Sequence, residues 1–303
     1  MRIYSHPACL AHDTGPTHPE RPERLSAVTN ALHAAFPHVS WHEAPRASRG
    51  QLLRAHTPAL LEQVLETRPP ERIFLDADTV LSPASAEAAQ RAAGAVVAAV
   101  DAVLGGQAER VFCAVRPPGH HATTDVAMGF CLFNNIAVGA LHALAVHGLD
   151  RVAIVDFDVH HGNGTQSIFE HDRRVLFASS HQLPLYPGTG NRNETGEGNI
   201  VNAPLPPDAG SALFRAVWTE RLLPAVDAFK PQLLMISAGF DAHRLDPLAQ
   251  LQLEAADFAW ITAELVALAK RHCGGRIVST LEGGYDLTAL AESSVAHVGA
   301  LLT

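Results

Sequence analysis

Short runs of apolar residues alternate along the chain with longer segments of helical character. The short runs are almost continuously apolar, as expected of parallel strands that are covered on both faces. Most of the longer segments end at or just before a glycine, which is a common helix stop. We therefore predict strands at Val111–Val115, Arg151–Asp156, Val175–Ser179, Gln232–Ser237 and Arg276–Leu281, and helices at Ala84–Leu104, Asn135–His147, Ser211–Phe229 and Glu254–His272.

This alternation predicts an α/β protein with a parallel sheet and crossover helices on both faces. The 303 residues contain no repeat, low-complexity tract or break in composition, so we expect one domain spanning residues 1–303. Loops rich in proline and glycine follow predicted strands at 116–119, 184–190 and 282–284. Ligand sites in such sheets lie beyond the carboxyl ends of the strands, so these loops predict one active-site face.

Composition narrows the range of functions. The net charge of −9 argues against a surface that binds nucleic acid. There is no apolar run long enough to cross a membrane and no signal-peptide pattern, so we expect a cytoplasmic protein without a membrane partner. The oligomeric state stays open, a homo-oligomer included. We expect neither disulfides nor a cysteine zinc site, because the four cysteines are scattered: Cys9, Cys113, Cys131 and Cys273.

The segment with the clearest chemistry reads DFDVHHGNG and follows a predicted strand directly. Alternate residues of an extended chain share a face, so we expect Asp156, Asp158 and His160 to point the same way. Asp158 and His160 then offer an oxygen and a nitrogen, a ligand set that suits zinc. The alternative is an aspartate that caps the next helix, beside a solvated histidine.

A third ligand is available in the segment SAGFDAH, where a strand again ends in small residues before a carboxylate. Asp241 would complete a site with three protein ligands and one open position, as in catalytic zinc sites. Taken alone, Asp241 would equally suit a helix N-cap or a turn.

Two further strand ends carry groups that suit acid–base chemistry. His120 and His121 lie on a rigid Pro/Gly loop and are candidates for general base and general acid. Tyr285 follows two glycines and is a candidate for stabilising an oxyanion with its hydroxyl. In isolation the histidine pair would more readily suggest a surface loop, and the tyrosine a half-buried residue at a helix start.

Taken together, these segments resemble the histone deacetylase and acetylpolyamine amidohydrolase superfamily, nearer to its class II and bacterial members than to class I. The matching motifs, in this order, are RPPGHHA, GFCLFNN, DFDVHHGNGTQ, SAGFDAH-x-x-DPL and EGGYD, and the match extends from HPERPERL at His18–Leu25 to EGGYDL. The resemblance implies the arginase/deacetylase fold, with a parallel sheet of about eight strands. It also implies hydrolysis of an N-acyl amide, usually acetyl, to an amine and a carboxylate at one zinc ion.

Position by position, the resemblance implies that Asp158, His160 and Asp241 are the zinc ligands. It implies that His120 and His121 are the paired catalytic histidines and that Tyr285 polarises the acyl carbonyl. Class I members have aspartate where this chain has Asn163, the partner of the second histidine. Asparagine supplies no negative charge, so we expect His121 to be less readily protonated. His120 keeps a carboxylate partner in Asp156, and which histidine takes the water proton stays open.

The resemblance also implies a tunnel for the acyl chain and a second ion. Gly129 and Phe130 match one tunnel wall, Tyr186 matches the opposite aromatic wall, and Arg24 matches an arginine that lines an internal exit for the released acid. A structural monovalent cation, K⁺ or Na⁺, is implied behind the zinc. Its site, made largely by backbone carbonyls, would comprise Asp156, Asp158, His160, Ser179 and Ser180.

Three other functions compete with deacylation. An arginase-like enzyme would use two manganese ions, but the chain lacks the extra aspartate pair after Asp241. A protein that binds acylated partners without catalysis could lose Tyr285 or a zinc ligand, but every part is present. A purely structural metal site would not leave a coordination position open.

The substrate is the least determined feature. One polyamine-selective branch of the family has glutamate at the position of Leu248, and the apolar residue here favours acyl-lysine of a peptide or protein over a small acylated amine such as an acetylpolyamine. Rim carboxylates would still attract a cation, and those in or near candidate rim loops are Asp13, Glu20, Asp76, Asp78 and Asp125. We interpret His6, His12 and His18 as part of a solvated loop, not as a second metal cluster.

Overall fold

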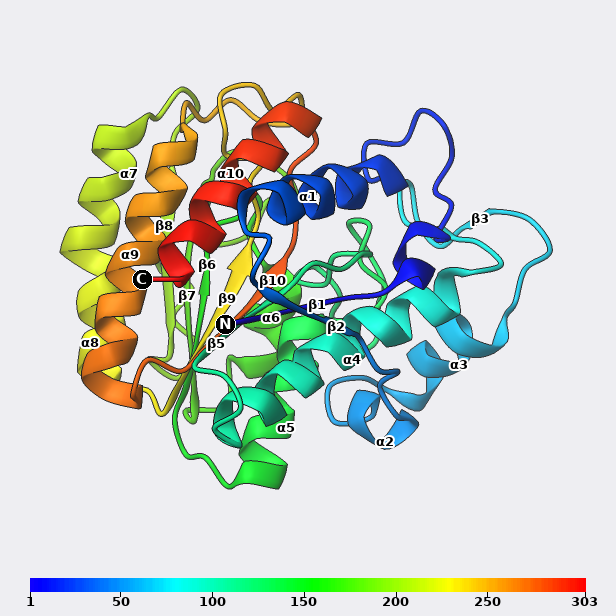
Figure 1. Ribbon diagram of the computed structural model, residues 1–303, viewed down its shortest axis with the longest axis horizontal. Helices are drawn as coiled ribbons and strands as arrows, with labels where there is room; N and C mark the ends of the chain where they lie inside the picture. The colour runs from blue at the N-terminus through cyan, green and yellow to red at the C-terminus, as the bar shows by residue number, and fades with distance from the viewer.

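Eight strands form one entirely parallel sheet in the order β2-β1-β5-β10-β9-β6-β7-β8, and a separate antiparallel ladder joins β3 to β4 (Figure 1). The computed structural model describes all residues, 1–303. The strands are β1 (Arg2–Ser5), β2 (Ser40–Glu43), β3 (Ile73–Phe74), β4 (Val80–Leu81), β5 (Arg110–Cys113), β6 (Val152–Asp156), β7 (Val175–Gln182), β8 (Ile200–Leu205), β9 (Leu233–Ala238) and β10 (Ile277–Leu281).

The five predicted strands are the five adjacent strands β5, β10, β9, β6 and β7 in the middle of this sheet. Every residue of these strands is buried, which accounts for their nearly continuous apolar sequence. The strands that the pattern did not reveal, β1, β2 and β8, lie toward the edges and keep partly exposed positions. The predicted parallel α/β fold with about eight strands is therefore confirmed.

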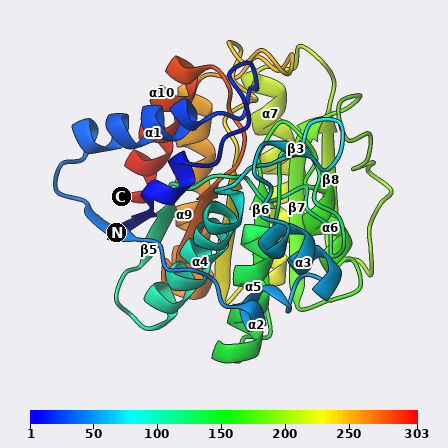
Figure 2. The same cartoon turned by 90° about the vertical axis from the view of Figure 1, so that its right-hand side faces the viewer.

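Helices cover both faces of the sheet. On one face α10 packs between α1 and α9, with α8 beyond α9; on the other, α5 packs between α4 and α6. Figure 2 turns α4 and α5 toward the viewer. The helices are η1 (Pro7–Leu10), α1 (Pro22–Ala35), α2 (Arg49–Leu52), α3 (Pro58–Glu66), α4 (Ser85–Leu104), α5 (Asn135–His147), α6 (Asn163–Phe169), α7 (Ser211–Val217), η2 (Trp218–Leu222), α8 (Leu223–Phe229), α9 (Ala255–Cys273) and α10 (Leu287–Leu301).

The four predicted helices are present, one of them in three parts. Residues 211–229 form α7, a π-helical turn and α8 in succession. Pro224 lacks a backbone N–H and so cannot continue the regular ladder of hydrogen bonds at this point. The Ser48 and Thr57 side chains cap the short helices α2 and α3, which apolar periodicity alone did not predict.

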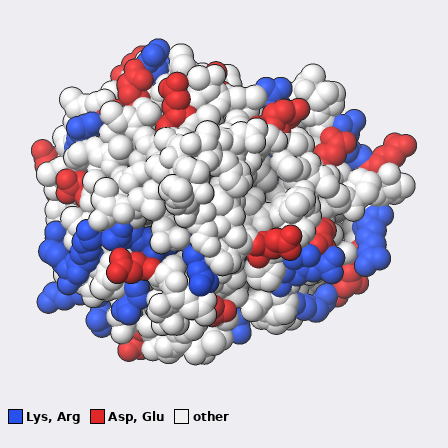
Figure 3. Space-filling view, in the orientation of Figure 1, with Lys and Arg blue, Asp and Glu red and all other residues white.

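Charged side chains are spread over the surface. In Figure 3 acidic residues are scattered over the visible face, and lysine and arginine gather at its lower left, near α8 and α9. None of the helices is both long and apolar enough to cross a membrane. All four cysteines are buried and unpaired.

Candidate active site

The side chains of Asp158, His160 and Asp241 meet at the carboxyl edge of the sheet, beyond the adjacent strands β6 and β9. His160 Nδ1 lies 3.2 Å from Asp158 Oδ1 and 3.1 Å from Asp241 Oδ2. One ligand atom from each of the three residues lies within 4.8 Å of the others, and all three side chains are buried. The structure thus brings together the three residues that the sequence suggested as metal ligands.

The local backbone reaches this arrangement by a different route from the one predicted. Strand β6 ends at Asp156, and the residues that follow bend, so alternation along an extended strand does not explain the convergence. Instead each aspartate accepts a hydrogen bond from the N–H two residues later. Asp156 Oδ1 accepts from Asp158 at 3.0 Å, and Asp158 Oδ1 accepts from His160 at 2.8 Å. Asp156 itself points to His120 and is not part of the ligand group.

Backbone N–H groups orient both carboxylates of the ligand group. The Val159 N–H donates to Asp241 Oδ1 at 2.8 Å, and the Gly283 N–H donates to Asp158 Oδ2 at 2.8 Å. A Cβ atom on Gly283 would overlap both the Asp158 and the Asp241 carboxylates. The second position of the EGGYD segment must therefore be glycine for the backbone to approach the ligands this closely.

The ligand group carries an excess of buried negative charge. Burial and the neighbouring Asp158 raise the pKa of Asp241. Burial would lower the pKa of His160, but Asp158 and Asp241 outweigh it and raise the pKa to about 10. A divalent cation would compensate two such carboxylates, and one nitrogen with two oxygens is a ligand set that zinc accepts. The residues present therefore fit a zinc ion.

The two neighbouring histidines have different partners. His120 Nδ1 lies 2.9 Å from Asp156 Oδ2, whereas His121 Nδ1 lies 2.8 Å from the Asn163 side-chain oxygen. Burial would lower the pKa of His120, but Asp158 and Asp156 raise it to about 10. Burial, reinforced by His120, lowers the pKa of His121 well below its ordinary value. The pair is therefore electrostatically asymmetric, with positive charge favoured on His120.

The loop that carries both histidines rests on Glu282, a residue to which sequence reasoning assigned no role. Its carboxylate accepts hydrogen bonds from the backbone N–H groups of Gly119 at 2.7 Å and His120 at 3.2 Å, and from the Ser237 hydroxyl at 3.1 Å. Burial raises the pKa of Glu282 to about 7. The position of Glu282 in EGGYD, at the end of β10, was the available signal, but its partners are distant in sequence.

A cavity of about 240 Å³ leads to the ligand group. The Phe130 ring lies 5.8 Å from the Tyr285 ring, and the Tyr186 ring lies 5.1 Å from the His121 ring, between centroids. All four residues predicted for the tunnel and its entrance thus reach this cavity, with two of the catalytic candidates. Its lining consists of Asp78, His121, Gly129, Phe130, His160, Leu185, Tyr186, Leu248 and Tyr285.

Gly129 shapes one wall of the cavity. Its φ is +56°, and a Cβ atom there would lie 2.6 Å from the His121 ring. The next residue, Phe130, also has a positive φ, +67°, which is unusual for an aromatic residue. Its N–H donates to the Thr79 hydroxyl at 3.1 Å, and its ring packs edge-on against His18. The unusual backbone therefore orients a ring that borders the cavity.

The expected rim carboxylates differ in where the structure places them. Asp78 lines the cavity, whereas Asp13 belongs to a separate surface hollow and pairs with Arg72. The expectation for Glu20 is wrong, because Glu20 is fully buried and bonds to Arg116 at 2.7 Å and to Arg24 at 2.9 Å. A buried carboxylate needs such partners, and Arg116 lies 96 residues away, where sequence patterns do not reveal the pairing.

Arg24 connects this buried ion-pair network to the candidate site. Its guanidinium lies 4.8 Å from the centroid of the Tyr285 ring and donates to the carbonyl oxygens of Glu282 at 2.6 Å and Gly284 at 2.5 Å. Burial would raise the pKa of Glu20, but Arg116 and Arg24 outweigh burial and lower it. The network therefore holds the segment before Tyr285 from behind.

The interpretation of the N-terminal histidines needs a correction. His12 is not solvated: it is buried, its Nδ1 lies 2.7 Å from the Ser85 hydroxyl, and burial lowers its pKa to about 4. His6 accepts a hydrogen bond from the Ala8 N–H, and His18 contacts Phe130. The three histidines do not form a metal-binding group.

The serines expected at a monovalent cation use their hydroxyls elsewhere. Ser179 Oγ lies 2.9 Å from His181 Nδ1, and Ser180 Oγ accepts a hydrogen bond from Trp218 at 3.0 Å. A hydroxyl oxygen has two lone pairs, so these single contacts leave both serines able to contact a cation, and the cation site stays a prediction.

Comparison with known proteins identifies the family. Residues 18–301 match the histone deacetylase domain, so the chain belongs to the histone deacetylase family, as its motifs indicated. The histone deacetylase-like amidohydrolase of Pseudomonas aeruginosa is 40% identical over 92% of this chain and 74% of its own length. Histone deacetylase 14, chloroplastic, of Arabidopsis thaliana is 38% identical over 99% of this chain and 76% of its own length.

A solved structure supports the same assignment. The HD domain of HDA15 superimposes with a TM-score of 0.94 at 37% identity, over 100% of this chain and 91% of that chain. The family to which this chain belongs thus includes proteins named deacetylase and amidohydrolase.

Proposed function

We propose that the protein is a zinc-dependent deacylase that hydrolyses an N-acyl amide to a free amine and a carboxylate. The observation that carries this proposal is the position of the buried ligand group at the base of a cavity also lined by His121 and Tyr285. The relatives named deacetylase and amidohydrolase support the same reaction class.

Asp158, His160 and Asp241 would hold the zinc ion. When bound, zinc supplies a Lewis acid for the acyl oxygen and lowers the pKa of a water molecule. The chain's own contribution is to hold two carboxylates and one imidazole together beside the cavity, which His160 lines. The substrate carbonyl therefore enters from the cavity side.

His121 is the residue that we assign to proton transfer. It lines the cavity, and its only side-chain hydrogen bond uses Nδ1, which leaves Nε2 free to take a proton from water and deliver it to the departing amine. His120 does not line the cavity and is hydrogen bonded to Asp156. We assign His120 the supporting role of a positive charge beside the reacting atoms.

Tyr285 would donate its hydroxyl to the oxyanion that forms on the acyl oxygen. Its backbone N–H donates to Asp246 at 2.7 Å, and Arg24 lies against its ring. These contacts fix the tyrosine from two sides, as a preorganised donor requires. Arg24 also remains our proposal for the residue that lines an internal path for the released acid.

We propose acyl-lysine of a peptide or protein as the substrate class. Leu248 lines the cavity and can pack against the methylenes of the lysine side chain, whereas it would desolvate the charge of a polyamine at this depth. Asp78 supports the second candidate, an acetylpolyamine, because its carboxylate also lines the cavity. An ammonium about 4 Å away would gain about 1 to 4 kcal/mol from such a carboxylate.

The experiment compares kcat/KM for an acetyl-lysine peptide, a longer acyl-lysine peptide, and acetylated spermidine and putrescine. We expect the peptides to be the better substrates, Leu248→Glu to narrow or reverse that preference, and Asp78→Asn to lower activity on the polyamines more than on the peptides. Better turnover of acetylpolyamines by the unmodified enzyme would overturn the substrate class and keep the reaction class. Failure to hydrolyse any acyl amide with zinc supplied would overturn both.

Four further features belong to the proposal. Residues 1–303 form one catalytic domain, and the cytoplasm is the proposed compartment. Asp156, Asp158, His160, Ser179 and Ser180 would hold a K⁺ or Na⁺ ion, largely through backbone carbonyls. We propose neither nucleic acid nor a membrane as a partner. Potassium-dependent thermal stability, measured with zinc held constant, tests the second ion.

A further inference from the structure

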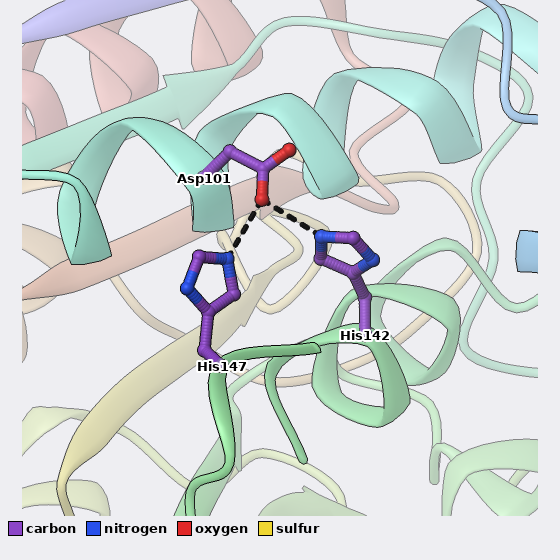
Figure 4. A group of neighbouring side chains, drawn as sticks. All are labelled: Asp101, His142 and His147. Atoms are coloured by element: carbon purple, nitrogen blue, oxygen red, sulfur yellow. Dashed lines mark hydrogen bonds and ion pairs between the residues drawn. The ribbon is translucent and has the colours of Figure 1, made fainter. Parts of the chain in front are cut away.

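A second group of metal-binding side chains lies between α4 and α5, outside the candidate active site. Figure 4 shows one oxygen of Asp101, on α4, between the rings of His142 and His147, on α5. Asp101 Oδ1 lies 2.7 Å from Nε2 of each histidine. Two imidazole nitrogens and one carboxylate oxygen thus converge from two helices that pack against each other.

The hydrogen bonds indicate which imidazole nitrogens of this group carry a hydrogen when no metal is bound. A carboxylate oxygen is an acceptor, so both Nε2 atoms carry a hydrogen and donate it to Asp101. His142 Nδ1 is then an acceptor, and Arg54 donates to it at 3.0 Å. The His147 Nδ1 atom has no hydrogen-bond partner within the protein. Each histidine can therefore bind a cation through Nε2 if its proton moves to Nδ1.

We propose that Asp101, His142 and His147 bind a second divalent cation of the zinc class. Two histidines and one carboxylate, with water at the remaining position, form a common zinc ligand set. Zinc bonds of roughly 2.1 Å in a tetrahedral arrangement separate ligand atoms by about 3.4 Å. Each of the two Asp101–histidine distances, now 2.7 Å, must therefore lengthen by only about 0.7 Å, and the two nitrogens already lie within 4.8 Å of each other. The exposed Asp101 side chain, with 52% of its surface accessible, has room for this movement.

Arg54 is the feature that opposes metal binding. Its guanidinium donates to His142 Nδ1, the atom that must carry the proton when Nε2 binds a metal. Its positive charge also lies close to the ion. Arg54 is exposed and can turn into solvent, so it weakens the site without closing it. This opposition predicts that removing Arg54 tightens the site, whereas removing a ligand abolishes it.

The site is remote from the cavity. His147 is the last residue of α5, whereas the N-cap residue of the same helix, Asn134, donates to the carbonyl of Ala122, next to His121. The 13 residues of α5 correspond to about 20 Å of helix. None of the three ligands lines the cavity, so occupancy of the second site is measurable apart from catalysis.

The experiment counts zinc bound per chain after equilibrium dialysis of the intact protein at near-neutral pH, with Zn²⁺ as the only added metal. We expect two equivalents for the wild type and one for His147→Ala and Asp101→Asn, with the affinity of the second site lowered at least about 100-fold. We expect Arg54→Met to keep two equivalents and to bind the second more tightly. His171→Ala, which removes an exposed histidine beside Glu170, is the matched control and should keep two.

An Asp241→Asn background separates this inference from the proposed catalytic zinc. In that background we expect one equivalent, which is lost on adding His147→Ala. Deacylase activity at one equivalent of zinc should not differ between the wild type and His147→Ala. A single equivalent in the wild type that disappears with Asp241→Asn, or two equivalents that survive both His147→Ala and Asp101→Asn, would overturn the second site.

Discussion

Two groups of similar donor atoms lie at opposite ends of this fold, and they differ in what surrounds them. The ligands Asp158, His160 and Asp241 are buried, backbone N–H groups orient both carboxylates, and a cavity opens beside them. In the second group Asp101 is exposed, His147 is half-buried and His142 is buried, and the Asp101 carboxylate bonds to the two histidines. Similar donor atoms would therefore suit a metal at either place, whereas only the buried group has a cavity and neighbouring acid–base residues for catalysis.

The largest expected effect is on the buried group. Asp241→Asn removes a charged ligand and leaves the remaining buried groups without their cation, so activity should fall by about 1000-fold or more, beyond the loss of a single oxyanion donor. Deacylation of an acyl-lysine peptide with zinc supplied measures this. Asp101→Asn is the matched control and should keep wild-type activity. Equal loss in both variants would erase the distinction between the two groups.

The next largest effect concerns the buried ion pairs that Glu20 makes with Arg24 and Arg116. Glu20→Gln leaves Arg24 and Arg116 without their fully buried partner, so the free energy of unfolding should fall by about 3–5 kcal/mol. Denaturant titration measures the change. Glu197→Gln alters an exposed pair with Arg173 and should stay within about 1 kcal/mol of the wild type.

The difference in stability between the wild type and Glu20→Gln should change with pH in one direction. The pKa of Glu20 is lowered on folding, because Arg116 and Arg24 outweigh burial. Its ion pairs therefore contribute fully above the unfolded-state pKa of 4.5, and the contribution declines as the pH falls below it. We expect the stability gap between the wild type and Glu20→Gln to narrow on acidification. A gap that widens would contradict the assigned pairing.

A smaller effect, on activity alone, tests whether the Tyr285 hydroxyl contributes to catalysis beside the buried ligand group. Tyr285→Phe removes one hydroxyl from the cavity and should lower kcat by about 100- to 1000-fold while zinc binding is kept. Zinc content and kcat are measured on the same preparation, with Tyr4→Phe, in β1, as the control. A rate near that of the wild type would make Tyr285 a packing residue.

The smallest expected effect is on stability, when the group of Asp101, His142 and His147 is changed without added metal. Asp101 accepts two hydrogen bonds at an exposed position, so Asp101→Asn should change the free energy of unfolding by about 1 kcal/mol or less. Thermal unfolding in the presence of a chelator measures it. A loss of stability as large as that of Glu20→Gln would show that Asp101 and its histidines stabilise the fold despite the exposure of Asp101.

The central strands and the ligand residues were determined by the sequence itself. Strands buried on both faces must be apolar throughout, so β5, β6, β7, β9 and β10 are visible as uninterrupted runs. The polar residues that follow such runs must lie at one edge of a parallel sheet, which predicted where Asp158, His160 and Asp241 meet. The edge strands escaped prediction because partial exposure removes the apolar signal.

Only the tertiary structure decided which distant side chains became partners. Glu20 and Arg116 are 96 residues apart, and Glu282 supports a loop 162 residues before it. Asp101 meets its two histidines because α4 and α5 pack side by side, at an angle that no local pattern encodes. Local patterns report burial and backbone conformation within one segment. Pairings between segments depend on packing, which turned Glu20 from an expected rim carboxylate into a buried ion-pair partner.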